Sequence, residues 1–286
     1  MSDYESIWLM LAELDFEQRW LDIDGVRTRA AIAGPATGAP VVMLHGTGAH
    51  WETFAPTLPA LSADFRCIAF DMLGNGFTDK PDRDYDIASY IDHVRAVMRE
   101  LGVDRAHFVG MSLGAWVSAT IASRYPELVE RLILMSPAGL HATQQNMERI
   151  RAERTKAVQD PQWDSIKAMF DHLIADEQRR LPDLVGLRQA IYRRDDTRAT
   201  IDRLLTLQDP QKRERNLLSE SDWQAITAPT LVVASGADHS EYASTAQTIA
   251  RLIPDTEVLD MPGVRHWPHF EDPTVFNPAA LEFLSR

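Results

Sequence analysis

The pentapeptide Gly110-Met111-Ser112-Leu113-Gly114 is the most chemically suggestive pattern in the chain. It lies between an apolar run, Ala106–Val109, that predicts a strand and a stretch, Ala115–Tyr125, that predicts a helix. A serine on so sharp a turn projects its hydroxyl above a sheet as a nucleophile, and the flanking glycines avoid steric clashes. The Leu113 amide, at the positive end of the helix, would face a developing oxyanion. Ser112 is therefore the candidate nucleophile, and it needs a base, an acid and a second oxyanion donor.

Two residues after later predicted strands supply the candidate base and acid. His266 follows the last one, where a loop can carry a side chain across the carboxyl edge of a sheet, and His269 is its rival. Asp238 could orient the imidazole and stabilise its charged form, although it could also cap the helix expected over Ser240–Ile253. The chain order Ser112, Asp238, His266 favours a catalytic triad because a known class of hydrolases uses that order.

The segment His45-Gly46-Thr47-Gly48 supplies the candidate second oxyanion donor. It follows the predicted strand Val41–Leu44, and we expect the Thr47 amide to act together with that of Leu113. A glycine-rich turn can also be no more than a turn, and the chain carries no phosphate-loop or dinucleotide-binding pattern. The four elements together predict a serine hydrolase-type site.

Alternation of apolar and polar residues predicts the elements that position this site. Glu17–Asp24 and Val26–Ala33 alternate around Asp24-Gly25, which indicates an antiparallel hairpin. Short apolar runs, mostly separated by helical patterns, then predict a mostly parallel sheet covered on both faces, and hence an α/β fold. These runs are Val41–Leu44, Cys67–Phe70, His107–Val109, Leu132–Met135, Leu231–Ala234 and Glu257–Leu259.

The strand signal disappears between Pro137 and about Trp223, where charged, leucine-bearing helical segments break at Pro161, Pro182 and Pro210. This pattern predicts a helical cap, so we expect a first part of the core over residues 1–137, a cap or lid over 138–222 and a second part of the core over 223–286. Most charged cap residues would be solvated helix faces. The pocket would depend on how Trp163, Met169, Phe170 and Leu173 face the site.

Composition excludes several classes of partner. A chain of 286 residues with net charge -13 offers no basic stripe for nucleic acid or an anionic membrane surface. No stretch is long enough to span a membrane, and Met1–Leu14 lacks the regions of a signal peptide. Cys67 is the single cysteine, in an apolar run, so it can form no internal disulfide and we expect a buried thiol. These features predict a cytoplasmic protein.

The motifs resemble the α/β-hydrolase superfamily over nearly the whole chain. The matching segments are His45-Gly46, Asp71-Met72-Leu73-Gly74-Asn75-Gly76, the Ser112 turn, Asp238 and His266-Trp267-Pro268. Within it, His45-Gly46-Thr47-Gly48-Ala49-His50-Trp51 and Arg188-Gln189-Ala190-Ile191-Tyr192 resemble the meta-cleavage product hydrolases of bacterial aromatic degradation.

That resemblance implies a specific reaction. The family cleaves a carbon-carbon bond in 2-hydroxy-6-oxohexa-2,4-dienoates, giving 2-hydroxypenta-2,4-dienoate and a carboxylic acid. It needs no metal or organic cofactor, and its members form dimers or larger homo-oligomers. Its substrate is a small molecule.

The resemblance also implies substrate-binding roles for Gly46, Met111, Arg188 and Trp267. Arg188 would hold the dienoate carboxylate through a forked contact, although it could equally be a surface arginine of the cap. Trp267 would wall the pocket. Met111 is a departure, because the residue before the nucleophile is often a substrate-contacting asparagine in that family, and methionine cannot donate a hydrogen bond.

The same machinery also hydrolyses esters and lactones, because such a site recognises a tetrahedral intermediate. A carboxylesterase or lactonase is therefore the first alternative. A ligand sensor with the cap as its interaction surface is a second one. Haloalkane dehalogenases and epoxide hydrolases are set aside because they need an aspartate where this chain has Ser112.

Overall fold

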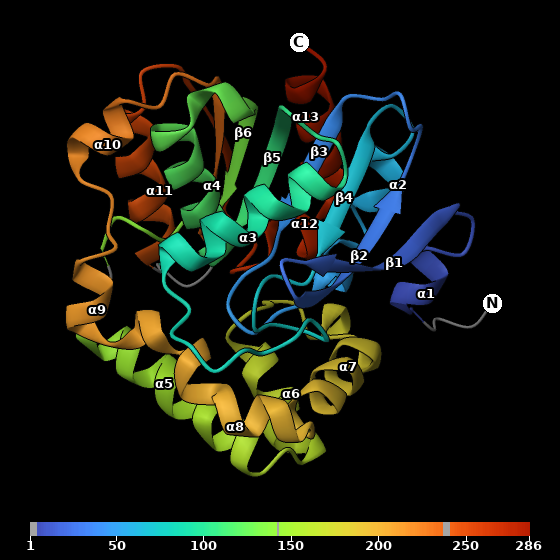
Figure 1. Cartoon of the computed structure of the whole chain (residues 1–286), viewed down its shortest axis with the longest axis vertical. Helices are drawn as coiled ribbons and strands as arrows, with labels where there is room; N and C mark the ends of the chain where they lie inside the picture. The colour runs from blue at the N-terminus through green and yellow to red at the C-terminus, as the bar shows by residue number, and fades with distance from the viewer. Residues whose placement is uncertain (1–4, 142, 237–240) are drawn as a thin grey trace.

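The computed structural model of the protein describes residues 5–141, 143–236 and 241–286. Within them, eight strands form one sheet in the order β1-β2-β4-β3-β5-β6-β7-β8. Figure 1 labels β1 to β6. The β1–β2 and β2–β4 pairs are antiparallel and the others are parallel, which confirms the predicted α/β fold. The strands are β1 Phe16–Ile23, β2 Val26–Ala33, β3 Pro40–Leu44, β4 Arg66–Phe70, β5 Ala106–Met111, β6 Val129–Met135, β7 Thr230–Ser235 and β8 Thr256–Met261.

The predicted hairpin forms between β1 and β2. Its two turn residues, Asp24 and Gly25, have φ angles of 50° and 82°. A two-residue turn with both φ values positive matches the right-handed twist of the strands that it joins. The turn therefore sets the register in which Ile23 faces Val26.

Burial separates the central strands from the edge of the sheet. Every residue of β5 and β7 is buried, because helices cover both faces there. In β8, which ends the sheet, most residues are half-buried or exposed. The predicted run Glu257–Leu259 therefore lies in a strand, but one that is covered less well than its neighbours.

Helices cover the two faces of the sheet (Figure 1). α3 (Ile87–Glu100) and α4 (Leu113–Arg124) lie on one face, and α2 (Leu58–Leu61) and α13 (Pro273–Leu284) lie together on the other. Ten of the twelve residues of α4 are buried, because α4 packs between the sheet and α3. α11 (Glu241–Leu252) packs on β7. The described core also includes α1 (Ile7–Met10), the 3-10 helix η1 (Trp51–Phe54) and α12 (Pro268–Glu271).

Only helical elements occupy the described residues between β6 and β7. Pro182 and Pro210 each begin a helix and Pro161 lies just before one, as suits a residue that lacks a backbone N–H. The 3-10 helices η3 (Glu177–Arg179) and η4 (Thr206–Gln208) lie among them, and the α-helices are α5 Gln144–Gln159, α6 Trp163–Asp171, α7 Pro182–Tyr192, α8 Asp195–Leu204, α9 Pro210–Glu214 and α10 Glu220–Gln224. No helix in the described ranges is long and apolar enough to cross a membrane.

Candidate active site

Ser112 lies on a strained turn between β5 and α4. Its φ and ψ angles are 55° and -111°, a conformation that costs energy in a residue with a side chain. A Cβ atom on Gly110 would come within 2.5 Å of the Gly114 carbonyl oxygen, and one on Gly114 within 2.0 Å of the Leu44 carbonyl oxygen. Both glycines are therefore required for β5, α4 and β3 to approach one another at the serine.

Two backbone N–H groups beside Ser112 are available to an oxyanion. Neither Thr47 nor Leu113 donates its N–H to another described residue, and both residues line the same cavity as Ser112. The next N–H, that of Gly48, is bound instead by the Asn75 side chain, whose Oδ1 lies 2.7 Å from the Gly48 nitrogen. The loop after β3 is thus fixed with the Thr47 donor left open.

The His45 side chain holds the start of this loop as a neutral imidazole. Its Nδ1 donates to the Gly46 carbonyl oxygen at 2.8 Å, and its Nε2 accepts from the Met72 N–H at 3.0 Å. Burial lowers the pKa of His45 to about 3. Because Nε2 can accept this bond only while unprotonated, His45 is a structural residue of the loop.

A buried ion-pair network fixes the end of the same loop. Arg29 donates to Asp71 at 2.8 Å and to Glu52 at 2.7 Å, and His50 lies 2.9 Å from the same Glu52 oxygen. Asp71 also accepts from the Trp51 N–H at 2.8 Å. Both carboxylates are less than 2% exposed, so Arg29 supplies the charge that buried carboxylates need.

His266 lines the cavity and is 7% exposed, with its ring centroid 4.4 Å from that of Tyr242. Burial, and then the charges of Arg154 and Arg149, lower the pKa of His266 to about 3. Its Nδ1 has no hydrogen-bond partner within the described residues. Asp238, the predicted acid, lies outside the described residues.

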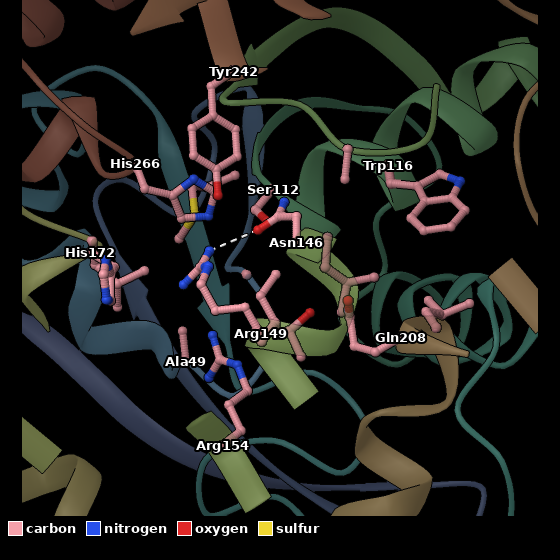
Figure 2. A pocket seen from close by; sticks show the side chains of 18 of the residues that line it. Ala49, Ser112, Trp116, Asn146, Arg149, Arg154, His172, Gln208, Tyr242 and His266 are labelled. Atoms are coloured by element: carbon pink, nitrogen blue, oxygen red, sulfur yellow. Dashed lines mark hydrogen bonds between the residues drawn. The ribbon is translucent and has the colours of Figure 1, made fainter. Parts of the chain in front are cut away.

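Ser112 and His266 line one cavity without a hydrogen bond between them in the described structure (Figure 2). Catalytic hydrogen bonds are often long in an empty site and tighten when substrate binds. His269, the rival base, is instead fully buried, with ring centroids 5.1 Å from Phe54 and 6.0 Å from Phe276. It does not line the cavity, and its surroundings are those of a packing residue.

The cavity encloses about 1120 Å³ of space between atoms, its open mouth included. It lies between the carboxyl ends of the central strands and the helices that follow β6. Besides the residues already placed there, its lining includes Ala49, Trp116, Pro137, Ala138, His141, Asn146, Ile150, Glu153, His172, Leu207, Gln208, Arg213 and Thr245.

Arg188 lines this cavity and is only 1% exposed. None of its three guanidinium nitrogens makes a hydrogen bond of standard geometry with a described residue, although the Tyr192 hydroxyl is near enough to raise the pKa of Arg188. Its guanidinium carbon lies 5.6 Å from the ring centroids of both Phe170 and Tyr192, and burial lowers its pKa. From the sequence, Arg188 could either bind a ligand or lie at the surface of the cap. In the structure it is buried and lines the cavity.

The other sequence-predicted substrate contacts meet at the same place. Met111 is fully buried and lines the cavity, and its sulfur would lie 3.1 Å from a Cβ atom on Gly46. Trp267 also lines it and packs edge-on against Phe170, with ring centroids 5.7 Å apart. Of the cap residues that could shape the pocket, Met169 and Leu173 line it, Phe170 supports Trp267 from behind, and Trp163 is 42% exposed at the surface.

Sequence reasoning missed a polar face of α5. Asn146, Arg149, Glu153 and Arg154 line the cavity together with Ile150. Arg149 donates to Asn146 at 2.7 Å, the bond dashed in Figure 2. Steps of three and four residues put these side chains on one face of a helix, so the spacing was a usable signal. Tyr242 was missed as well, and nothing in its sequence surroundings singles it out.

The fold and this site define an enzyme of the serine hydrolase type. The family model of the alpha/beta hydrolase fold matches residues 39–273, and the chain belongs to this family.

The chain is 28% identical to the 2-hydroxy-6-oxo-6-(2'-aminophenyl)hexa-2,4-dienoic acid hydrolase of Metapseudomonas resinovorans, over 96% of this chain and 93% of the relative. It is 27% identical to a 2-hydroxymuconate semialdehyde hydrolase of a Pseudomonas strain, over 91% of each chain. A meta-cleavage product hydrolase from Pseudomonas fluorescens, solved as a serine-to-alanine variant with acetates, superimposes with a TM-score of 0.80 at 25% identity, covering 96% of this chain and 98% of that one. The resemblance to meta-cleavage product hydrolases is confirmed.

Proposed function

We propose that the protein hydrolyses a carbon-carbon bond in a 2-hydroxy-6-oxohexa-2,4-dienoate-type compound. Ser112 and His266 would act with Asp238 as the triad, and the Thr47 and Leu113 amides would form the oxyanion hole. The products are 2-hydroxypenta-2,4-dienoate and a carboxylic acid. The relatives named above, whose names describe dienoate or semialdehyde hydrolases, support this assignment.

The observation that carries the proposal is the buried guanidinium of Arg188. Burying a charge without an ionic partner costs several kcal/mol, roughly, so an arginine of this kind supports an anionic ligand. A guanidinium offers parallel N–H donors that match a carboxylate, which the dienoate carries at C1. Arg188 lines the same cavity as Ser112, so a ligand held there lies beside the nucleophile.

The chemistry begins with a proton transfer that creates a leaving group. His266 moves the C2 hydroxyl proton to C5, which gives a 2,6-diketone. Ser112, or a water molecule activated by His266, then attacks C6, and the Thr47 and Leu113 amides stabilise the oxyanion. The C5–C6 bond breaks as its electron pair passes through C3 and C4 to the C2 oxygen. A proton on that oxygen gives the dienoate product, and water releases the acid.

Loss of the dienoate absorbance tests this reaction directly. We expect the wild-type enzyme to consume a coloured dienoate far faster than it hydrolyses aryl esters. Ser112→Ala should lower the dienoate rate by about 10⁴-fold or more. A stable dienoate absorbance alongside rapid ester hydrolysis would refute the carbon-carbon assignment.

Arg188→Gln tests the carboxylate contact. The variant should lower kcat/KM for the dienoate by roughly 100-fold or more and leave a neutral aryl ester within about threefold, because only the dienoate carries an anion. Arg193→Gln, an exposed residue just beyond the same helix, is the matched control and should change neither. Equal losses on both substrates would contradict the role of Arg188.

A carboxylesterase or lactonase is the second candidate function, and Met111 favours it. Its fully buried side chain lies in the cavity beside Gly46, where an apolar group adds nothing to the binding of a carboxylate. If the protein is an esterase or lactonase, Met111→Asn should lower ester turnover. If it cleaves the dienoate, Met111→Asn should leave dienoate turnover unchanged or raise it.

The remaining expectations belong to the same proposal. The helices between β6 and β7 would act as the cap over the site, and the protein would work in the cytoplasm as a homodimer or larger assembly. Light scattering of the purified protein measures the assembly.

A further inference from the structure

A second arginine lines the same cavity as Arg188 and contacts the same tyrosine. Arg154, from α5, has its Nη1 atom 3.2 Å from the Tyr192 hydroxyl, and Arg188 lies over the ring of the same tyrosine. Figure 2 shows Arg154 among the side chains that line the cavity. A Cβ atom on Gly48 would lie 2.7 Å from Arg154 Nη1 and 3.1 Å from the Tyr192 hydroxyl. Arg154 therefore reaches the loop after β3, next to Thr47.

The charge of Arg154 has no counter-ion among the residues that the structure describes. Among the described residues that line the cavity, Glu153 is the only carboxylate, and Arg149 binds both of its oxygens at 3.0 Å and 3.1 Å. No carboxylate of the described chain pairs with Arg154 or Arg188. Burial lowers the pKa of Arg188 most. Tyr192 raises this pKa, and the neighbouring positive charge of Arg154 lowers it.

Two cations that line one cavity and contact the same tyrosine favour a ligand with two adjacent acceptor oxygens. One forked guanidinium already satisfies one carboxylate, so a second one needs another acceptor close by. A 2-hydroxy or 2-oxo acid has this pattern, because its C2 oxygen lies next to the carboxylate.

We propose that Arg154 and Arg188 form a two-arginine clamp for a 2-oxo or 2-hydroxy acid head group. Arg188 holds the C1 carboxylate and Arg154 holds the C2 oxygen. The inference rests on the proposed function, since it assigns a partner to the oxygen that receives the electron pair when the C5–C6 bond breaks. Arg154 then stabilises charge where the leaving group develops it. It also supplies a donor in a site where Met111 has none.

Binding of two acids that differ only at C2 tests the clamp without any turnover. The probes are 2-oxopentanoate and pentanoate, titrated into the intact protein by calorimetry. We expect the wild-type protein to bind the 2-oxo acid about 10-fold more tightly, the size of one charge-assisted hydrogen bond. Arg154→Gln should abolish that difference and keep pentanoate binding within about threefold, whereas Arg188→Gln should weaken both acids.

Arg151→Gln is the matched control on the same helix. Arg151 pairs with Asp202 and its side chain is 43% exposed, outside the cavity lining, so the preference should persist in this variant. Thermal melting of each variant identifies a change caused by misfolding. The clamp is wrong if the wild-type protein binds both acids equally, or if Arg154→Gln weakens them by the same factor.

The dienoate assay separates this result from the proposed function. Cleavage of the dienoate with no preference for the 2-oxo acid would overturn the clamp alone. A preference that Arg154→Gln removes, in a protein that cleaves no dienoate, would support the clamp and overturn the proposed reaction. In the enzyme that cleaves the dienoate, Arg154→Gln should lower kcat by about 10-fold or more, because the charge on the C2 oxygen is largest as the bond breaks.

Discussion

The two sides of the cavity differ in how their polar groups are satisfied. On the side of the sheet, the loop after β3 is held by His45, Asn75 and the Arg29 network, and each of these has partners within the protein. On the side of α5 and α7, the buried guanidinium of Arg188 has no hydrogen-bond partner of standard geometry among the described residues, and Arg154 donates to the Tyr192 hydroxyl. The polar groups on the first side are satisfied within the protein, and those on the second side are the ones to which we assign a ligand.

This difference separates the groups suited to stabilise an oxyanion from those suited to bind a substrate. Oxyanion donors act best when they are fixed before the reaction, because reorganising them during catalysis would cost energy. Substrate-binding charges must instead be unpaired in the empty site, since an internal partner would compete with the ligand. The sheet side should therefore raise the stability of the fold. The unpaired charges of the arginine side should lower that stability and bind an anionic substrate.

Acid should lower the stability of the whole folded protein more than any single substitution. Burial lowers the pKa of His45, His93, His266 and His269 to about 3. A histidine whose pKa is depressed in the folded state contributes stability above pH 6.5, roughly, and loses it as the pH falls toward the folded value. Four such groups lower the unfolding free energy by on the order of 5 kcal/mol per pH unit near pH 5. The raised pKa of Glu271 offsets part of this.

Urea unfolding at a series of pH values between 7.5 and 5, roughly, measures this slope. His93 accepts the Leu73 N–H on Nδ1 at 3.2 Å, so it too is held in its neutral form. His93→Gln should make the slope shallower by one proton, and His172→Gln, at an exposed residue, should leave it unchanged. A stability that is flat over this range would contradict the neutral histidines.

Removing Arg29 should give the next largest loss. Arg29→Met leaves Asp71 and Glu52 buried without their cation, and breaking a buried pair in this way costs about 3–5 kcal/mol. Denaturant unfolding measures the loss. Arg19→Met is the control because Arg19 pairs with Glu17 at the surface, where ion pairs contribute little. If both variants were equally stable, the sheet side would not depend on its internal ion pairs.

Local patterns in the sequence predicted part of the sheet side. The turn at Ser112 needs glycines at fixed positions, and the hairpin needs Asp24-Gly25, so both leave a signature in a few adjacent residues. The Asp71–Gly76 motif belonged to the family resemblance, but its bonds to Arg29 and Gly48 did not follow from it. Those partners lie 42 and 27 residues away along the chain.

The arginine side could be predicted only in part. The motif around Arg188 indicated a carboxylate ligand through the family resemblance, but its burial depends on how α7 packs against α6. Arg154 was not singled out, because an arginine on a polar helix faces solvent unless that helix turns its face to a cavity. Its spacing from Arg149 and Asn146 showed a shared face, and only the packed helices show that this face lines the site.

Arg188→Met should change stability least, and in the opposite direction from Arg29→Met. The variant replaces an unpaired buried cation with an apolar side chain that fits between Phe170 and Tyr192, so we expect unfolding to become harder by about 1–2 kcal/mol. Dienoate turnover should be lost at the same time. Thermal unfolding without ligand measures the gain, and Arg193→Met at the exposed neighbouring position should show none.

The same pair of proteins should respond differently to a ligand. A carboxylate such as 2-oxopentanoate should raise the melting temperature of the wild-type protein, because it binds the folded state and satisfies the arginines. It should leave Arg188→Met almost unchanged. A destabilised Arg188→Met protein would mean that Arg188 holds the fold together as Arg29 does, and the two sides of the cavity would then not differ in kind.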